Sequence, residues 1–208
     1  MPESLTAEEV HSQNDPSVAK QFDDETPKAQ QFEDMYGIAD NMKFSLLGTY
    51  RPGVGPVHRA MAVGRREGPD FLYVANNHSQ KFKDLSENKE CSITFQDSST
   101  GNWISVTGTA TTTDNSDPRI KEIYSPVIKA WFGDLGDGVH NGTYEDPRMT
   151  LIEVKAKHIT YWKTTVGMLG FAKEVGLAAV TGKVAAPGVQ RRMTEEEIAQ
   201  ERKMRRNV

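Results

Sequence analysis

The sequence predicts a mainly β protein with peripheral helices, built as an antiparallel meander or small barrel. Short apolar segments rich in Val, Ile, Thr, Phe and Tyr follow one another along the chain. Turn residues separate them, as in segments 51–56 and 68–70. Because the connections are too short for crossover helices, antiparallel pairing is favoured. A length of 208 residues with 37% hydrophobic residues fits one domain with a modest core and polar extensions.

The individual elements follow from the spacing of apolar residues. A 3–4 spacing predicts a helix over residues 28–40. The expected strands span residues 43–50, 57–65, 70–75, 90–96, 103–113 and 149–162. A short helix over residues 80–88 interrupts them and begins after Ser79, a residue type preferred at helix N-caps.

A longer helix is expected between Asp117, its N-cap, and Trp131. Pro118 takes the first helical position, and apolar residues recur along one face of the helix. Pro126 lies inside this helix and is expected to kink it. The glycine-rich segment 133–144 then forms a loop that leads to the last strand.

The composition divides the chain into three parts. Residues 1–27 are polar with few large apolar side chains, which is typical of a flexible N-terminal arm. Residues 28–165 contain the predicted strands and form the barrel domain. Residues 166–208 are predicted to be a helical C-terminal extension, with a short apolar helix over 166–180 and a linker over 185–188.

The last helix of the extension is indicated by a capping box, in which Thr194 precedes Glu197 by three residues. It ends in the basic segment 202–206, which is either a solvated helix face or a contact for a nuclear import factor or an acidic partner. The solvated face is the interpretation we favour, because Glu195 and Glu196 lie at the other end of the same helix.

Charge and residue usage exclude several classes of protein. A net charge of −4 argues against general nucleic-acid binding. No apolar run approaches the ~18 residues of a membrane span, and no signal peptide is visible, so we expect a cytoplasmic protein. Cys91 is the single cysteine and is expected to be a buried small residue. The five histidines show no metal-ligand spacing, and no acid–base pair or nucleophile motif is visible.

One group of residues suggests a ligand. Arg59 lies in an apolar strand, and Ser79 and Lys81 lie at the start of the helix over residues 80–88. Together they could hold a phosphate ester without a glycine loop, which points to a nucleotide-type cofactor and most simply to a flavin. A lysine in the first turn opposes the helix dipole, and a bound dianion reverses that cost. The alternatives are an outward-facing arginine, a helix cap and a solvated lysine.

Several short segments, taken in order, resemble one family. They are Arg59-Ala60-Met61-Ala62, Ser79-Gln80-Lys81, Ser105-Val106-Thr107-Gly108-Thr109-Ala110, Lys129-Ala130-Trp131-Phe132 and Ile159-Thr160-Tyr161-Trp162. Over roughly residues 30–165 the chain is similar to the FMN-binding split barrels of the pyridoxamine 5′-phosphate oxidase type. Within that group it most resembles the general stress proteins and the fungal blue-light-inducible proteins. The resemblance implies a six-stranded antiparallel split β-barrel.

The resemblance also implies a homodimer with FMN in two clefts at the subunit interface. Carried onto this chain, Arg59 and Lys81 bind the phosphate, and Ser79 adds a donor. The other positions that the resemblance places at the cofactor are Ala60, Met61, Ala62, Val74, Ala75, Gln80, Trp131 and Trp162. For Trp131, packing in the core is an equal alternative. Gln80 stands where the oxidase pattern has a second basic residue.

The function implied is that of a flavin-dependent oxidoreductase of the general-stress type with an unknown substrate. Trp162 is followed by Lys163-Thr164-Thr165, without the arginine and histidine that hold the vitamin in pyridoxamine phosphate oxidase, so that activity is not expected. A second reading is a flavin carrier or a redox or light sensor without turnover. A third is a haem-binding split barrel with His58 or His78 as an iron ligand.

Overall fold

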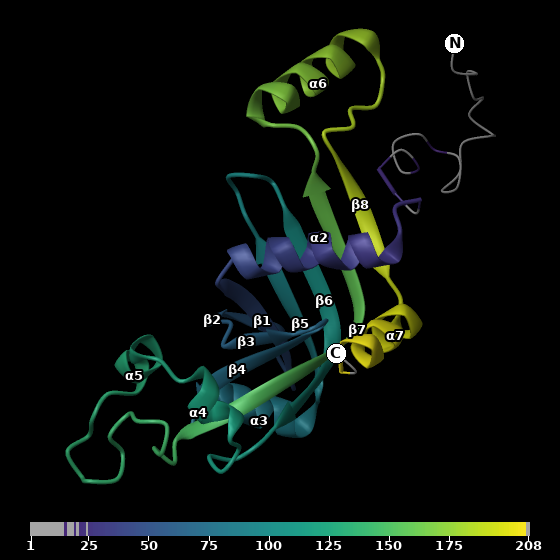
Figure 1. Cartoon of the computed structure of the whole chain (residues 1–208). Helices are drawn as coiled ribbons and strands as arrows, with labels where there is room; N and C mark the ends of the chain where they lie inside the picture. The colour runs from purple at the N-terminus through teal and green to yellow at the C-terminus, as the bar shows by residue number, and fades with distance from the viewer. Residues whose placement is uncertain (1–14, 16–18, 20, 24, 207–208) are drawn as a thin grey trace.

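One long strand organises the sheet. The computed structural model describes residues 15, 19, 21–23 and 25–206. Strand β7 (Met149–Thr164) pairs with β4 (Asp70–Asn76) through its first half and with β8 (Gly188–Met193) through its second half. Along its other edge β7 pairs with β6 (Trp103–Thr112). Because one strand changes partners midway, the sheet opens into two arms (Figure 1).

The other strands continue the sheet in the order β2-β1-β5-β6-β7-β4-β3. They are β1 (Phe44–Arg51), β2 (Gly55–Ala62), β3 (Arg65–Glu67) and β5 (Glu90–Gln96), and every strand pairing is antiparallel. The two ends of this path meet between β2 and β3. There Val63 donates to the Lys43 carbonyl at 3.0 Å and Gly64 donates to the Leu72 carbonyl at 2.8 Å. The predicted antiparallel barrel is therefore confirmed.

Among the described residues the sheet has eight strands, where six were expected. One addition arises because the segment predicted as a single strand over residues 57–65 divides into β2 and the short β3. The other is β8, which begins at the end of the predicted linker over residues 185–188. The extension predicted to be helical therefore contributes a strand to the barrel sheet as well.

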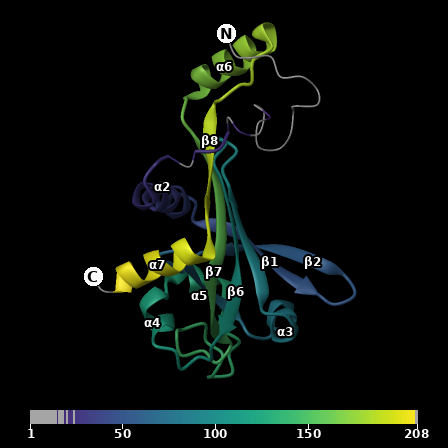
Figure 2. The ribbon, with the colours of Figure 1, turned by 90° about the vertical axis from the view of Figure 1, so that its right-hand side faces the viewer.

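Helix α2 (Lys28–Asn41) crosses one side of the sheet, as Figures 1 and 2 show. Its residues Phe32, Met35 and Tyr36 are buried in the same core as Leu47 and Ile93 of the strands. This helix is predicted correctly by its 3–4 apolar spacing, because that spacing places its apolar residues on one face.

Helices α3 (Gln80–Glu87), α4 (Arg119–Ile123) and α5 (Pro126–Phe132) lie at the lower end of the barrel in Figure 1, below α2. The prediction of one helix kinked at Pro126 is wrong, because the chain leaves the helical conformation at Tyr124 and Ser125. A residue before proline avoids the helical region, and Ser125 accordingly has φ −147° and ψ 162°. Its hydroxyl then accepts a 3.4 Å bond from the Ile128 amide and caps α5.

Helix α6 (Met168–Thr181) stands at the tip of the β7–β8 hairpin, away from the body of the molecule (Figures 1 and 2). Its exposed apolar side chains are Leu169, Phe171, Val175, Leu177 and Val180. Among the helices formed by the described residues, none has the length and apolar character needed to cross a membrane.

Helix α7 (Glu195–Arg206) begins with the predicted capping box. The Thr194 amide donates to Glu197 Oε2 at 2.9 Å, and the Glu197 amide donates to Thr194 Oγ1 at 3.4 Å. Ile198 is fully buried in the core. Arg202 donates to both carboxylate oxygens of buried Asp70, at 2.7 and 2.8 Å. A solvated basic face is therefore the wrong interpretation for Arg202, whose charge is used to fix α7 to β4.

The described end of the predicted N-terminal arm lies against β8. Phe22 forms a parallel bridge with Gln190, and Asp23 accepts an ion pair of 2.8 Å from Arg191. Arg191 is buried, and Asp34 of α2 gives it a second carboxylate. Residues 1–14, 16–18, 20 and 24 of that arm lie outside the described residues.

Candidate cofactor site at the start of α3

The site predicted from the sequence begins where β4 ends. Asn76 closes the strand, and the chain turns directly into α3. Ser79 occupies the predicted N-cap position, but its hydroxyl does not cap the helix. It donates to the Asn76 carbonyl at 2.6 Å and accepts a 2.7 Å bond from Lys81 Nζ. Ser79 therefore holds the ammonium group of Lys81 beside the turn that joins β4 to α3.

A buried carboxylate organises the neighbouring side chains. Asp84 of α3 is 1% exposed and accepts bonds from Arg51 at 3.0 and 3.2 Å. It also accepts from Arg59 at 3.2 Å, from Thr49 at 2.9 Å and from Gln80 at 3.2 Å. The Arg51 hydrogen bond is the main reason that the pKa of Asp84 falls to about 2. One carboxylate thus connects β1, β2 and α3.

Arg59 points toward this group from β2. Side chains alternate along that strand, and Arg59 and Met61 share its more buried face. The Arg59 guanidinium donates to the Leu47 carbonyl at 3.2 Å and to Thr49 Oγ1 at 2.8 Å. The outward-facing alternative for Arg59 is therefore wrong.

Lys81, unlike Arg51 and Arg59, is not paired with Asp84. It is half-buried, and its amino group meets Ser79 Oγ and lies 6.0 Å from the centre of the Phe82 ring. Among the described residues no carboxylate forms an ion pair with it. Burial, and then the positive charge of Arg59, lower the pKa of Lys81. Arg51, Arg59 and Lys81 against one carboxylate give this cluster a net charge of +2, which favours an anion beside Lys81.

The strand residues predicted at the cofactor fall into two environments. Met61 and Ala75 belong to the main core, whereas Ala60 and Ala62 lie exposed on the opposite face of β2. Val74 packs with the smaller cluster beneath α4. Of the predicted residues, Arg59 and Gln80 meet at Asp84, and Lys81, bound to Ser79, lies close enough to Arg59 to feel its charge. Contact between the predicted strand residues and the ring of a flavin stays a prediction.

The two predicted tryptophans lie elsewhere in the chain. Trp162 pairs in register with Trp103 on the face of β7 opposite to buried Tyr161. Its ring packs over Gly188, where a Cβ atom would come within 2.6 Å of it. Trp131 on α5 is 79% exposed, so core packing is the wrong alternative for it within one chain. Neither tryptophan contacts the cluster around Asp84 in the part of the chain that the structure describes.

A groove of about 620 Å³ lies between α2 and the turn that joins β5 to β6. Its walls include Phe44, Asn102 and Lys163, the residue after Trp162. None of the predicted cofactor residues lines this groove. The groove is therefore separate from the residues at the start of α3.

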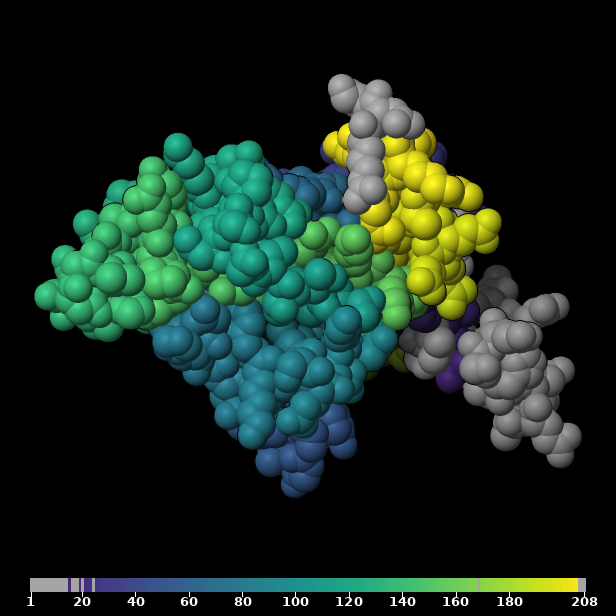
Figure 3. All heavy atoms as spheres, turned by 90° about the horizontal axis from the view of Figure 1, so that it is seen from below, coloured from purple at the N-terminus to yellow at the C-terminus, as the bar shows by residue number. Residues whose placement is uncertain are grey.

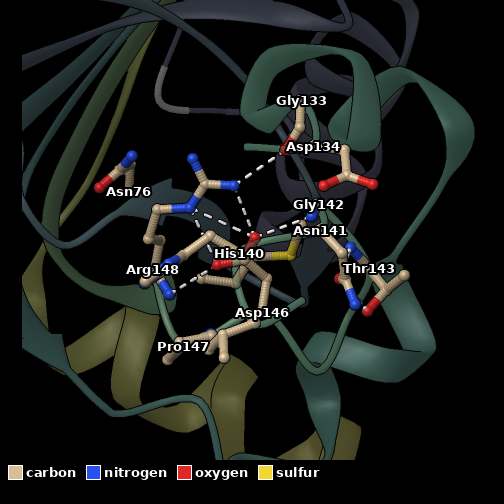
Figure 4. Close-up of polar contacts among 12 residues, drawn as sticks. Asn76, Gly133, Asp134, His140, Asn141, Gly142, Thr143, Asp146, Pro147 and Arg148 are labelled. Atoms are coloured by element: carbon tan, nitrogen blue, oxygen red, sulfur yellow. Dashed lines mark hydrogen bonds and ion pairs between the residues drawn. The ribbon is translucent and has the colours of Figure 1, made fainter. Parts of the chain in front are cut away.

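A buried ion pair holds the loop after α5 (Figure 4). Asp146 is fully buried and accepts bonds from Arg148 and from the Gly142 amide, at 2.6 and 2.8 Å. Arg148 also donates to the Gly133 carbonyl at 2.9 Å, directly after α5. Figure 3 shows this loop (green) as a lobe on one side of the surface. The pair thereby fixes the end of the helix that carries Trp131.

Comparison with known proteins places the chain in a family. A family model described as pyridoxamine 5′-phosphate oxidase like matches residues 30–186. This chain belongs to the pyridoxamine 5′-phosphate oxidase-like family. The match continues past residue 165 through α6, so the prediction that the resemblance ends before the C-terminal extension is wrong.

The chain is also similar to individual proteins along most of its length. Protein bli-3 of Neurospora crassa is 37% identical over 187 residues, covering 88% of this chain and 89% of that protein. A solved structure of a putative general stress protein 26 from Jannaschia sp. CCS1 has a TM-score of 0.61 at 19% identity, covering 80% of this chain and 99% of that one.

A related FMN-binding protein from Nostoc punctiforme PCC 73102 has a TM-score of 0.51 at 10% identity, covering 65% of this chain and 83% of that one. At such identities these two structures confirm the fold alone, a split barrel with peripheral helices.

Proposed function

We propose that this protein binds FMN with its phosphate at the start of α3 and acts as a flavin-dependent oxidoreductase. The observation that carries the proposal is Lys81, a half-buried ammonium group beside Arg59 without a carboxylate partner among the described residues. The FMN-binding relative from Nostoc supports the choice of anion. Protein bli-3 and the general stress proteins support the class of protein.

The residues present fit a phosphate monoester. Such a group carries a charge of about −1.5 to −2 at pH 7, which matches the net charge of +2 on the cluster. Arg59 and Lys81 supply charge-assisted donors, and the hydroxyl of Ser79, directly before α3, accepts a bond from Lys81 Nζ. When bound, FMN supplies a reversible acceptor for a hydride or electrons. The chain supplies binding and orientation through these side chains.

We further propose that the working unit is a homodimer. Arg59 shares the inner face of the sheet with Leu47, whereas Trp162 lies on the face of β7 opposite to buried Tyr161, and β2 and β7 are not neighbouring strands. A flavin gripped by Arg59 therefore meets Trp162 only if the tryptophan comes from a second copy. Phe44 and Leu46 on the outer face of β1 are 59% and 44% exposed, and they offer apolar surface for such a contact.

Light scattering on the flavin-loaded protein is expected to give the mass of two chains. Pairing follows from the proposal that each flavin needs Arg59 of one copy and Trp162 of the other. Replacing Leu46 with glutamate is expected to reduce both the mass and the amount of flavin retained, because it places a charge on the outer face of β1. The matched control is Thr107→Glu on the exposed outer face of β6. A monomer that keeps its flavin would contradict this arrangement.

The test of the flavin role is the visible absorption spectrum of the purified protein. Bands near ~375 and ~450 nm should remain with the protein after it is loaded with FMN and excess FMN is removed. A protein that stays colourless after loading would refute the cofactor assignment. A Soret band in the protein as purified would instead indicate haem.

The carrier or sensor alternative is favoured by one observation. Helix α6 exposes five large apolar side chains away from the barrel, which is a surface that a partner protein could cover. Helix α7 does not offer a second one, because Ile198 and Arg202 are used within the chain. Steady oxidation of a reduced nicotinamide by the FMN-loaded protein would favour the enzyme. Tight FMN without turnover would favour the carrier or sensor.

A further inference from the structure

Arg51 is a charged residue near the proposed phosphate position that the sequence patterns do not single out. It ends β1, and its side chain is 34% exposed. Its Nε and Nη2 atoms contact Asp84 at 3.0 and 3.2 Å. Its Nη1 atom makes no hydrogen bond to the described residues, so both N–H donors of that atom remain available. Burial is the main cause that lowers the pKa of Arg59, and the positive charge of Arg51 lowers it further.

Asp84 fixes both guanidinium groups in place. It is bound edge-on by Arg51, and its Oδ2 atom accepts from Arg59 at 3.2 Å. Thr49 joins the two sides, because its hydroxyl donates to Asp84 and accepts from Arg59. A buried carboxylate with these partners holds its neighbours in one geometry, since any rotation would leave a buried charge unpaired.

We propose that Arg51 is a third phosphate-binding residue and that Asp84 is the positioning residue that aligns Arg51 with Arg59. The proposal rests on the proposed FMN function of the same site. It names the ligand class more narrowly, as a flavin that ends in a phosphate monoester. With Asp84 ionised, three cations leave a net charge of +2, which matches a monoester dianion. Riboflavin has no phosphate, and each phosphate of FAD has one ester and one anhydride bond, which leaves it a single charge.

The experiment measures dissociation constants for FMN, riboflavin and FAD by flavin fluorescence, for the full chain and its variants. In the wild type, FMN is expected to bind at least ~100-fold tighter than riboflavin or FAD, as expected for two or more charge-assisted bonds. Arg51→Gln should reduce the FMN-to-riboflavin ratio about tenfold and leave riboflavin binding unchanged. Arg65→Gln is the matched control, because Arg65 is also 34% exposed and ion-paired but lies on β3.

The role of Asp84 is tested by a double-mutant cycle. Asp84→Asn should reduce the ratio at least ~10-fold in the wild type and by a clearly smaller factor in the Arg51→Gln background, because there Asp84 still aligns Arg59 but no longer aligns Arg51. Additive effects would refute the positioning role. An unchanged FMN-to-riboflavin ratio in Arg51→Gln would refute the assignment of Arg51 as a phosphate-binding residue. This variant changes a partly exposed residue, so it still tests the proposal if Asp84→Asn does not fold.

Failure of the proposed function looks different from failure of this inference. A wild-type protein that binds none of the three flavins refutes both. A wild-type protein that binds FMN and riboflavin equally keeps the flavin but overturns the phosphate cluster. A wild-type protein that prefers FMN, together with an unaffected Arg51→Gln variant, keeps the proposed function and overturns only the inference.

Discussion

Replacing Arg59 and Lys81 together with alanine is expected to weaken FMN binding by about 3–6 kcal/mol, at roughly 1.5–3 kcal/mol for each charge-assisted contact. Arg59 is aimed by Asp84 and Thr49, and Lys81 is held by Ser79. Removing both leaves Arg51 as the one cation of the cluster. Riboflavin should bind as before, because the loss concerns the phosphate. Isothermal titration or fluorescence titration with both flavins gives the comparison.

The matched control for that variant replaces Arg65 and Lys83, one arginine on β3 and one exposed lysine two residues along α3. Its FMN affinity should be unchanged. Lys81→Met separates binding from folding. Burial, and then the charge of Arg59, lower the pKa of Lys81 in the folded protein, so holding its charge there costs stability relative to the unfolded chain. The variant should therefore unfold at higher urea concentration while binding FMN more weakly. An affinity change below about 0.5 kcal/mol in the double variant would refute the phosphate assignment.

Arg202→Ala is expected to lower the free energy of unfolding by about 3–5 kcal/mol, the usual cost of leaving one member of a buried ion pair without its partner. Asp70 is 4% exposed, and Arg202 supplies both of its side-chain donors. The same guanidinium also donates to the Ala156 carbonyl of β7 at 2.9 Å. Urea unfolding followed by circular dichroism measures the effect.

The neighbouring Lys203→Ala is the control, because that side chain is exposed, and its cost should stay within about 0.5 kcal/mol. Asp70→Asn combined with Arg202→Ala should recover part of the loss, since the buried charge is then removed. A loss below about 1 kcal/mol for Arg202→Ala alone would show that α7 is held mainly by Ile198 rather than by this pair.

Most of the strands and helix α2 could be predicted because the apolar residues of each element recur at the spacing typical of that element, alternate positions in a strand and every three to four in a helix. Strand β8 could not, since its Gln190, Arg191 and Arg192 read as a polar segment. Arg191 is buried there because Asp23 and Asp34, more than a hundred residues earlier, neutralise it. Such a pairing leaves no local pattern. The break before Pro126 is a local feature, by contrast, and follows from the steric restriction on the residue before proline.

The sequence predicted some residues of the candidate site and missed others. Arg59, Ser79 and Lys81 lie around one point as expected. Arg51 and Asp84 were missed because nothing local marks them: Arg51 ends a strand beside a turn, and Asp84 is one of several charged residues in a short helix. Their contact depends on the register that places Thr49 opposite Val57 in β1 and β2, and on α3 packing beneath it.

The Asp70–Arg202 pair also has a consequence for biosynthesis. The two residues are 132 positions apart, so at about 5–20 residues per second the carboxylate emerges from the ribosome roughly 7–26 seconds before its arginine. During that interval β4 can find its place in the sheet only with an unneutralised charge at its first residue. Helix α7 therefore neutralises Asp70 only after all the strands of the sheet have been translated.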